Sequence, residues 1–337
     1  MEQEQTVLVT GGSGFLGGWC VVELLRVGYR VRTTVRDLAR ESEVRANVAT
    51  QVDARDRLTV AVADLTDDRG WAEAVGGCDF VLHVASPFPP AQPKDPDELI
   101  VPARDGTLRV LRASLAAGVQ RVVVTSSVAA VRGGGHGAAN GRALTEEDWT
   151  DPHNERLSPY VRSKTIAELA AWDFMREQGA TERLVTVLPG AIIGPVLGAD
   201  RSYSLQAIER LLGGSMPGLP RLGFSFIDVR DVASLELLAM TAPGAAGQRL
   251  IAASRFLWFS DVAAVLRERL GPDARKVPSR TVPNIVVRGL ALFDPGIRTV
   301  VSDLGVKTTY SLDKAQALGW SPRPVEDSIV DCARSLL

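Results

Sequence analysis

Short runs of apolar and β-branched residues alternate with longer amphipathic segments from Thr6 to about Leu188. This alternation is typical of βαβ units on a parallel sheet. Most runs are apolar on both faces, as in strands covered by helices on both sides. The predicted strands are Thr6–Thr10, Arg30–Val35, Leu58–Ala63, Phe80–Val84, Arg121–Thr125 and Leu184–Leu188, and the clearest predicted helices are Phe15–Val27, Asp97–Ala117 and Pro159–Gln178.

The rhythm changes after Pro189, where Gly and Pro become frequent and the later elements are spaced less regularly. We therefore predict an α/β fold with a Rossmann-type, doubly wound parallel sheet in residues 1–189 and returning segments near 224–252. Residues 190–337 are expected to form mostly a smaller substrate-binding lobe. Within it, Val262–Leu270 has the pattern of an amphipathic surface helix whose charges serve solubility.

The composition fits a soluble globular protein: 45% of the 337 residues are hydrophobic, 23% are charged, and the net charge is -2. This balance argues against nucleic-acid binding and favours small-molecule partners, with the chain a monomer or homodimer. Cys20, Cys78 and Cys332 fit neither a disulfide framework nor a zinc site, which favours a reducing cytoplasm. The start of the chain lacks the cationic flank of a secretory signal, and no apolar stretch reaches the roughly 20 residues that cross a bilayer.

A glycine-rich segment follows the first predicted strand directly and leads into a helix. Gly11, Gly14 and Gly17 give the spacing GxxGxxG, which provides a tight turn, close backbone approach to a pyrophosphate and close packing of helix on strand. The helix N-terminus offers N–H groups and a positive dipole end to phosphates. The alternative is a turn that merely connects two elements. The predicted cofactor contacts here are Gly11, Ser13, Gly14, Phe15, Leu16 and Gly17.

The end of the second strand bears on the choice of nicotinamide cofactor. An acidic residue roughly 20 positions past the glycines binds the ribose 2′-hydroxyl of NAD, whereas an Arg accommodates the 2′-phosphate of NADP. Arg36 stands there, with Arg32 and Arg40 nearby, so we predict NADPH. The neighbouring Asp37 keeps dual specificity open, and a solvated surface charge is the alternative for Arg36.

Asp64 and Leu65 follow the third predicted strand. The carboxylate of Asp64 could accept a hydrogen bond from the adenine amino group. The competing structural role is to cap a helix that starts near Thr66, because Asp is a favoured N-cap residue.

Tyr160 and Lys164 lie one turn apart on one face of the helix that follows Pro159. A phenol normally titrates at about pH 10, but a neighbouring ammonium and an oxidised nicotinamide favour its anion. Tyr160 could then exchange a proton with a substrate oxygen. At the end of the fifth strand, Ser127 is expected to orient a carbonyl and stabilise charge on its oxygen, and Ser126 to line the nicotinamide pocket through its backbone.

Together these residues resemble extended short-chain dehydrogenase/reductases, most closely the dihydroflavonol 4-reductase, cinnamoyl-CoA reductase and aldehyde/ketone reductase branch. The resemblance spans nearly the whole chain. It is carried by Thr10–Gly17, Val31–Asp37, His83–Pro87, Thr145–Trp149, Tyr160–Lys164 with Ala167 and Glu168, Pro189–Ala191, Phe226–Val232 and Leu318–Trp320.

The resemblance implies further roles for matched positions. Lys164 would also bind the nicotinamide ribose, and Pro189 and Ile192 would abut the nicotinamide. The cofactor cleft would be lined by Val84, Ala85 and Ser86, and the substrate pocket walled by Phe88 and Phe226, for which plain core packing is the alternative.

The sequence also departs from parts of this pattern. After Ser127 no Asn follows that could grip a flavonoid catechol, which argues against a dihydroflavonol reductase. Val128 and Ala129 stand where sugar-nucleotide dehydratases of similar fold carry two acidic residues, so dehydration is not expected. His83, at a strand end, is expected to be packed or hydrogen-bonded, and His136 and His153 fall in predicted loops; none has a metal-ligand partner at useful spacing. Packing residues on predicted helices are expected at Trp19, Trp71 and Trp172.

The expected function is NADPH-dependent reduction of a ketone or aldehyde, with Tyr160 as proton donor. The alternatives are an epimerase or dehydratase that regenerates a bound nicotinamide, and a sensor or scaffold that binds dinucleotide without turnover.

Overall fold

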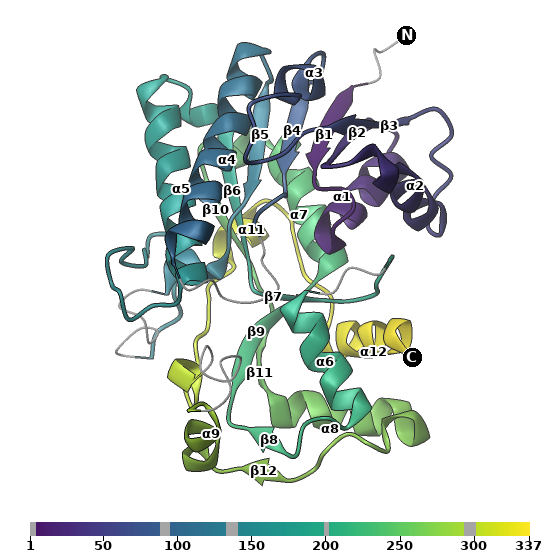
Figure 1. Ribbon diagram of the computed structural model, residues 1–337, viewed down its shortest axis with the longest axis vertical. Coiled ribbons are helices and arrows are strands. Elements are labelled where there is room, and N and C mark those ends of the chain that lie inside the picture. The colour runs from purple at the N-terminus through teal and green to yellow at the C-terminus, as the bar shows by residue number, and fades with distance from the viewer. Residues whose placement is uncertain (1–4, 88–94, 133–140, 199–201, 293–300) are drawn as a thin grey trace.

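Seven parallel strands form the central sheet of the computed structural model, which describes residues 5–87, 95–132, 141–198, 202–292 and 301–337 (Figure 1). Across the sheet they run β10 (Arg249–Ala252), β6 (Leu184–Pro189), β5 (Arg121–Thr125), β4 (Phe80–His83), β1 (Thr6–Thr10), β2 (Arg30–Val35) and β3 (Leu58–Val62). The strand order reverses at β1, which has β2 on one side and β4 on the other. Such a switch point opens a ligand crevice at the carboxyl ends of the strands.

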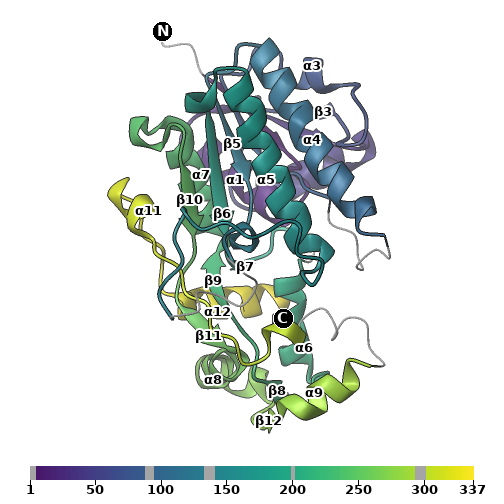
Figure 2. The same ribbon diagram turned by 90° about the vertical axis from the view of Figure 1, so that its left-hand side faces the viewer.

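Helices cover both faces of this sheet because both faces are apolar. In β1, Val7 and Val9 point to one face and Leu8 to the other. The first face packs against α1 (Phe15–Arg26), α2 (Glu41–Ala49) and α7 (Val229–Thr241), and the second against α3 (Trp71–Val75), α4 (Asp97–Ala116) and α5 (Pro159–Glu177) (Figure 2). The packing role predicted for the tryptophans is confirmed for Trp19, Trp71 and Trp172.

A second apolar core lies in the lower part of Figure 1. Its strands pair as β11 (Phe256–Trp258), β9 (Gly223–Asp228) and β7 (Ala191–Ile193), and separately as β8 (Leu219–Pro220) with β12 (Thr281–Val282). Its helices are α6 (Tyr203–Gly213), α8 (Phe259–Leu270), α9 (Asn284–Leu290) and α12 (Val325–Leu336). The remaining α11 (Asp313–Ala317) packs through Ala315 on the large sheet's core. Phe15, at the start of α1, touches both cores.

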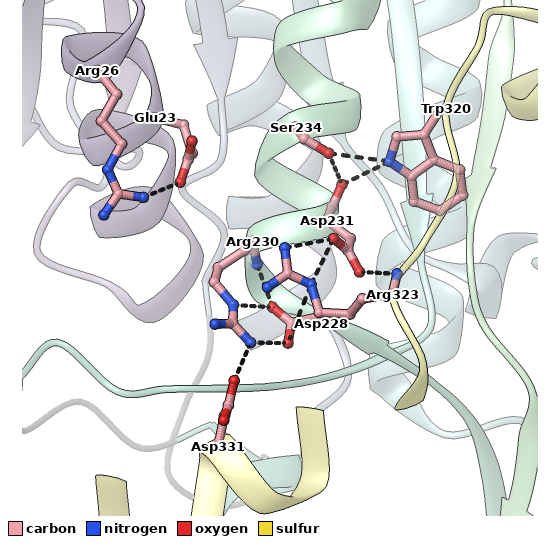
Figure 3. Close-up of polar contacts among 9 residues, drawn as sticks. All are labelled: Glu23, Arg26, Asp228, Arg230, Asp231, Ser234, Trp320, Arg323 and Asp331. Atoms are coloured by element: carbon pink, nitrogen blue, oxygen red, sulfur yellow. Dashed lines mark hydrogen bonds and ion pairs between the residues drawn. The ribbon is translucent and has the colours of Figure 1, made fainter. Parts of the chain in front are cut away.

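A polar cluster fastens the C-terminal segment to the junction of β9 and α7 (Figure 3). Asp228 caps α7 through the backbone N–H of Arg230 and also accepts that residue's guanidinium at 2.8 and 2.9 Å. The same guanidinium reaches Asp331 of α12, and the indole N–H of Trp320 donates to the carbonyl oxygen of Asp231. Two segments far apart in the sequence, Phe226–Val232 and Leu318–Trp320, therefore meet in one structural unit.

The predicted strands and helices of the large sheet are confirmed, with ends that differ by no more than one residue. The predicted surface helix in the second lobe is also present, as α8, with Glu268 and Arg269 exposed; Arg267 instead donates to the carbonyl of Pro278. Among the described residues, no helix has the length and apolar character to span a bilayer.

One expected element is absent: no helix begins near Thr66. The Asp64 carboxylate accepts hydrogen bonds from the Thr66 N–H and hydroxyl, at 2.8 and 2.7 Å, and so forms a turn. The helix α3 starts only at Trp71, after Gly70 with φ +84°. A Cβ at Gly70 would lie 2.2 Å from the Val62 carbonyl oxygen, so this close return of the chain requires glycine.

Candidate active site

The glycine loop after β1 is packed so closely that several of its glycines have no room for a side chain. Gly11 has φ +74° and lies against Ala85, which follows β4. A Cβ at Gly12 would come within 2.1 Å of the Thr33 hydroxyl, and a Cβ at Gly17 within 2.2 Å of the Gly11 carbonyl oxygen. The spacing GxxGxxG already includes Gly11 and Gly17. It does not include Gly12, where glycine is required because Thr33 of the neighbouring strand β2 lies so close. The loop thus fits the close backbone approach that a pyrophosphate needs.

The N-terminus of α1 is open to an anion. Its N-cap is Gly14, which has no side chain to accept hydrogen bonds, and the first turn carries no acidic residue. Ser13, Gly14 and Phe15 are partly exposed, whereas Leu16 is buried. Because the first N–H groups of a helix lack partners within the helix, this end is suited to bind phosphate.

The arginines around the end of β2 have different surroundings. Arg32 donates to the carbonyl oxygens of Glu73, Ala74 and Gly76 at 3.1, 2.9 and 2.7 Å, and so anchors α3. Arg36 is exposed and makes no hydrogen bond or ion pair within the described part of the chain.

The two neighbours of Arg36 are engaged elsewhere. Arg40 pairs with Glu43, and the carboxylate of Asp37 accepts the Ala39 N–H at 2.9 Å as cap of the 3-10 helix Leu38–Arg40. Asp37 therefore acts as the cap of this short helix.

Asp64 and Leu65 lie at the same edge of the sheet. The Thr66 hydrogen bonds, together with the charge of Arg36, lower the pKa of Asp64. Leu65 packs directly beneath α4, where a Cβ at Gly106 would be 2.8 Å from that of Leu65, and its carbonyl oxygen accepts Arg109 at 2.8 Å. Asp64 is therefore an anion near Arg36, positioned by a turn and not by a helix cap.

Tyr160 lies in the first turn of α5, which begins with the N-cap Ser158 and with Pro159 at its first position. Pro is favoured there because its fixed φ suits a helix start and the N–H it lacks would have no partner. The hydroxyl of Ser127, which follows β5 and is buried, hydrogen-bonds to the phenol of Tyr160. Lys164 follows one turn later, so the three predicted residues lie together.

The pKa expected for Tyr160 has to be corrected. Burial raises the pKa of the phenol above its usual value, and the hydrogen bond to Ser127 only partly opposes this. The charge of Lys164 is not among the causes that shift the pKa of Tyr160. Burial lowers the pKa of Lys164 to about 8 against the influence of the carboxylates Glu168 and Glu236. The phenol therefore holds its proton at neutral pH.

A buried ion pair behind Ser126 was not identified from the sequence. Glu168 of α5 accepts the hydroxyls of Ser126 and Thr186 and pairs with Arg249 of β10 at 2.7 Å. Both side chains of the pair are at most 9% exposed. Glu168 was part of the sequence resemblance, but its partner Arg249 lies 81 residues further along the chain. No sequence pattern indicated that the two side chains would meet.

His83 is a packed residue, as the sequence indicated. Its Nδ1 lies 2.9 Å from the Thr10 hydroxyl, which also accepts the Ala85 N–H at 2.9 Å. Burial and the charge of Lys164 lower the pKa of His83 to about 3, so the ring is neutral. A cavity of about 20 Å³, enough for one water, is lined by residues that include His83, Ser126, Lys164 and Glu168.

The remaining predicted residues lie around this edge. Val84, Ala85 and Ser86 are partly exposed just after β4, Pro189 ends β6, and Ile192 is partly exposed on β7. Phe226 is 1% exposed and belongs to the second core, so it has no surface to offer a substrate. The prediction that it walls the substrate pocket is wrong, and Phe226 is a core packing residue. Phe88 and His136 lie outside the described residues.

Comparison with known proteins decides the family. The sequence profile of the NAD dependent epimerase/dehydratase family matches residues 7–252. The chain belongs to this family. The match runs from β1 to β10 and so includes every strand of the large sheet.

Within the family, the chain resembles plant reductases. It is 35% identical over 342 residues to cinnamoyl-CoA reductase CAD2 of Medicago truncatula, an alignment covering 98% of this chain and 95% of that protein. It is 36% identical over 276 residues to dihydroflavonol 4-reductase of Zea mays, covering 80% and 75%. The predicted resemblance to this branch of the extended short-chain dehydrogenase/reductases is confirmed.

Solved structures agree with this fold. The yeast methylglyoxal/isovaleraldehyde reductase Gre2, solved with NADPH, superimposes with a TM-score of 0.82 at 25% identity, over 99% of this chain and 98% of that chain. Gre2 of Candida albicans, also solved with NADPH, gives 0.79 at 26% identity, over 98% of each. The Rossmann-type fold predicted from the sequence is confirmed.

Proposed function

We propose that this protein reduces a ketone or aldehyde to the alcohol, with Tyr160 as proton donor. The protein is an NADP-dependent oxidoreductase of its family, and the proposal assigns the reacting residues. The observation that carries it is the meeting of Ser127 and Tyr160, beside Lys164, at the sheet edge that also bears the glycine loop. Bound NADPH would supply the hydride to the carbonyl carbon.

The residues of this chain would act on the carbonyl oxygen. Ser127 and Tyr160 are both hydroxyl donors, so together they can orient the carbonyl and stabilise negative charge that develops on its oxygen. Because burial raises its pKa, the phenol is protonated at neutral pH and has a proton to give. The O–H bond of Tyr160 breaks as the O–H bond of the alcohol forms.

Lys164 would stabilise the phenolate that remains and would hydrogen-bond to the nicotinamide ribose. Its pKa of about 8 keeps most of it as ammonium at neutral pH. Arg36, exposed at the end of β2, would bind the 2′-phosphate, and the open N-terminus of α1 the pyrophosphate.

The relatives support this assignment through their names. Cinnamoyl-CoA reductase, dihydroflavonol 4-reductase and Gre2 are all reductases, and two of the solved Gre2 structures contain NADPH. As substrate we propose a carbonyl compound of modest size.

The test is to mix purified protein with NADPH and a panel of aryl ketones, β-keto esters, diketones and aldehydes, and to follow the absorbance of the reduced cofactor. A reductase consumes NADPH stoichiometrically with the alcohol formed. An epimerase or dehydratase that regenerates its nicotinamide consumes none, and a sensor only binds it. Binding without consumption across the panel, or turnover undiminished in Tyr160→Phe, would overturn the proposal.

A further inference from the structure

A carboxyl group with no place in the mechanism lies behind the site. Glu236, on α7, is completely buried. Its Oε1 accepts the hydroxyl of Thr125, the last residue of β5, and its Oε2 accepts the thiol of Cys20 from α1 at 3.3 Å. Glu236 thus joins the helix that starts at the glycine loop to the strand that leads to Ser127.

Burying a carboxylate costs free energy unless the charge is compensated. Within the described residues, Glu236 forms no ion pair with an arginine or lysine at contact distance. Thr125, whose hydroxyl Glu236 accepts, lines the same small cavity as Lys164, so the carboxylate lies behind the cavity wall that carries the lysine. Lys164 is the cation whose charge acts on Glu236. Burial raises the pKa of Glu236 to about 7, and the Thr125 and Cys20 hydrogen bonds and the Lys164 charge oppose this rise.

A second carboxylate, Glu168, also acts on Lys164, and it differs from Glu236 in its partner. Glu168 is already neutralised by Arg249 at 2.7 Å, whereas Glu236 has two neutral hydrogen-bond donors. Glu168 has the larger influence on the pKa of Lys164, but its charge is balanced by Arg249, whereas the charge of Glu236 is balanced by no arginine among the described residues. The other titratable groups around this pair are His83 on β4, Tyr160 and Glu168 on α5, Arg249 on β10, and Cys20 and Glu23 on α1.

We propose that Glu236 is a positioning residue: a buried anion, held by Cys20 and Thr125, that keeps Lys164 in its ammonium form above neutral pH. The proposal rests on the proposed function for the role of Lys164 in catalysis, but the effect on the lysine itself does not. The two groups titrate as a coupled pair, since each charged form stabilises the other. As pH rises through 7, ionisation of Glu236 strengthens the hold of Lys164 on its proton.

The direct test is NMR of protein labelled with ¹³C at the ε-carbon of lysine. The chain has five lysines, Lys94, Lys164, Lys276, Lys307 and Lys314, and the Lys164 signal is the one lost in Lys164→Arg. In the wild type its titration midpoint is expected near pH 8. In Glu236→Gln, which keeps an acceptor for Thr125 but removes the charge, the midpoint should fall by about one unit.

The matched control is Glu146→Gln. Glu146 is also buried, at 4% exposure, and accepts the Ile251 N–H at 3.0 Å, but it is not among the groups that shift the pKa of Lys164. Its replacement should leave the Lys164 midpoint in place. An unchanged midpoint in folded Glu236→Gln, or an equal fall in both variants, would overturn the proposal.

A second variant covers the case in which Glu236→Gln does not fold. Cys20→Ala removes one donor to Glu236, raises the pKa of that carboxyl and so weakens its support of Lys164; the midpoint should fall by a smaller amount. If Cys20→Ala leaves the Lys164 midpoint unchanged, the proposal fails.

Kinetics then connect the lysine to turnover. With a shift of one unit, the ammonium fraction at pH 8 falls from about one half to about one tenth, so kcat/KM at pH 8 should drop about fivefold in Glu236→Gln. A shifted NMR midpoint in a protein without reductase turnover would sink the proposed function and leave this inference standing. Reductase turnover together with an unshifted Lys164 midpoint in Glu236→Gln would leave the proposed function standing and overturn this inference.

Discussion

The guanidinium carbon of Arg249 lies 3.5 Å from the ring centre of Trp149, and the same guanidinium forms an ion pair with Glu168. Its guanidinium also donates to the backbone carbonyl oxygens of Glu146 and Asp148. One side chain of β10 therefore holds the segment Thr145–Trp149 against α5, directly behind Ser126.

Arg249→Met should destabilise the protein by about 3–5 kcal/mol, because it leaves the Glu168 charge buried without a partner. Urea unfolding followed by circular dichroism measures the change. The control is Arg176→Met, which removes an exposed pair with Asp173 and should cost less than about 0.5 kcal/mol. Equal effects of the two replacements would contradict the view that burial makes this pair critical.

Gly12→Ala should weaken NADPH binding about tenfold or more, since the new Cβ would clash with a Thr33 hydroxyl that is held by the Val9 carbonyl at 2.8 Å. Titration of NADPH fluorescence measures the affinity. Gly213→Ala is the matched control, because a Cβ there meets nothing within 4 Å. If Gly12→Ala binds NADPH as tightly as Gly213→Ala, the loop does not approach the cofactor as proposed.

Arg36→Ala should raise the KM for NADPH about ten- to a hundredfold, the expected loss of a charge-assisted hydrogen bond, and change that for NADH little. Initial rates with each cofactor measure this. Arg45→Ala removes another arginine, on α2, that pairs with Glu41, and should affect neither cofactor. A KM raised equally for NADPH and NADH would show that Arg36 does not recognise the 2′-phosphate.

Tyr160→Phe should lower kcat about 10²- to 10⁴-fold, since it removes the proton donor but keeps the ring. NADPH binding, measured by fluorescence, should change little in the same variant. Loss of binding in parallel with loss of turnover would indicate a structural role for Tyr160 instead of a chemical one.

The pH dependence of kcat/KM should show an alkaline limb near pH 8. Lys164, whose pKa burial lowers to about 8, loses its charge as pH rises through that value, whereas Tyr160, whose pKa is raised, stays protonated. Rates measured from pH 6 to 10 locate the limb. In Lys164→Arg the cation cannot titrate in this range, so the limb should move above pH 10 while the overall rate falls. A limb that stays near pH 8 in this variant would assign it to another group.

The sequence alone determined the large sheet and its cofactor edge. Strand and helix periodicity marked six of the sheet's seven strands and the helices α1, α4 and α5 to within one residue at each end, because buried parallel strands are continuous apolar runs and their helices are amphipathic. The strand β10 was covered only by the expected returning segments near 224–252, and the helix expected near Thr66 is absent. The sequence also showed the cofactor edge and the catalytic pair, because each depends on neighbours within one turn or one loop. These are the glycine spacing, Arg36, and Tyr160 with Lys164.

Tertiary structure decided what depends on contacts between distant segments. Cys20 and Glu236 are 216 residues apart, and Glu168 and Arg249 are 81 apart; no local pattern pairs them. Such contacts set burial and charge around each group, and these in turn fix pKa values. For this reason the sequence could name Tyr160 and Lys164, while only the packed structure showed that burial raises the pKa of the phenol and that the lysine charge faces two buried carboxylates.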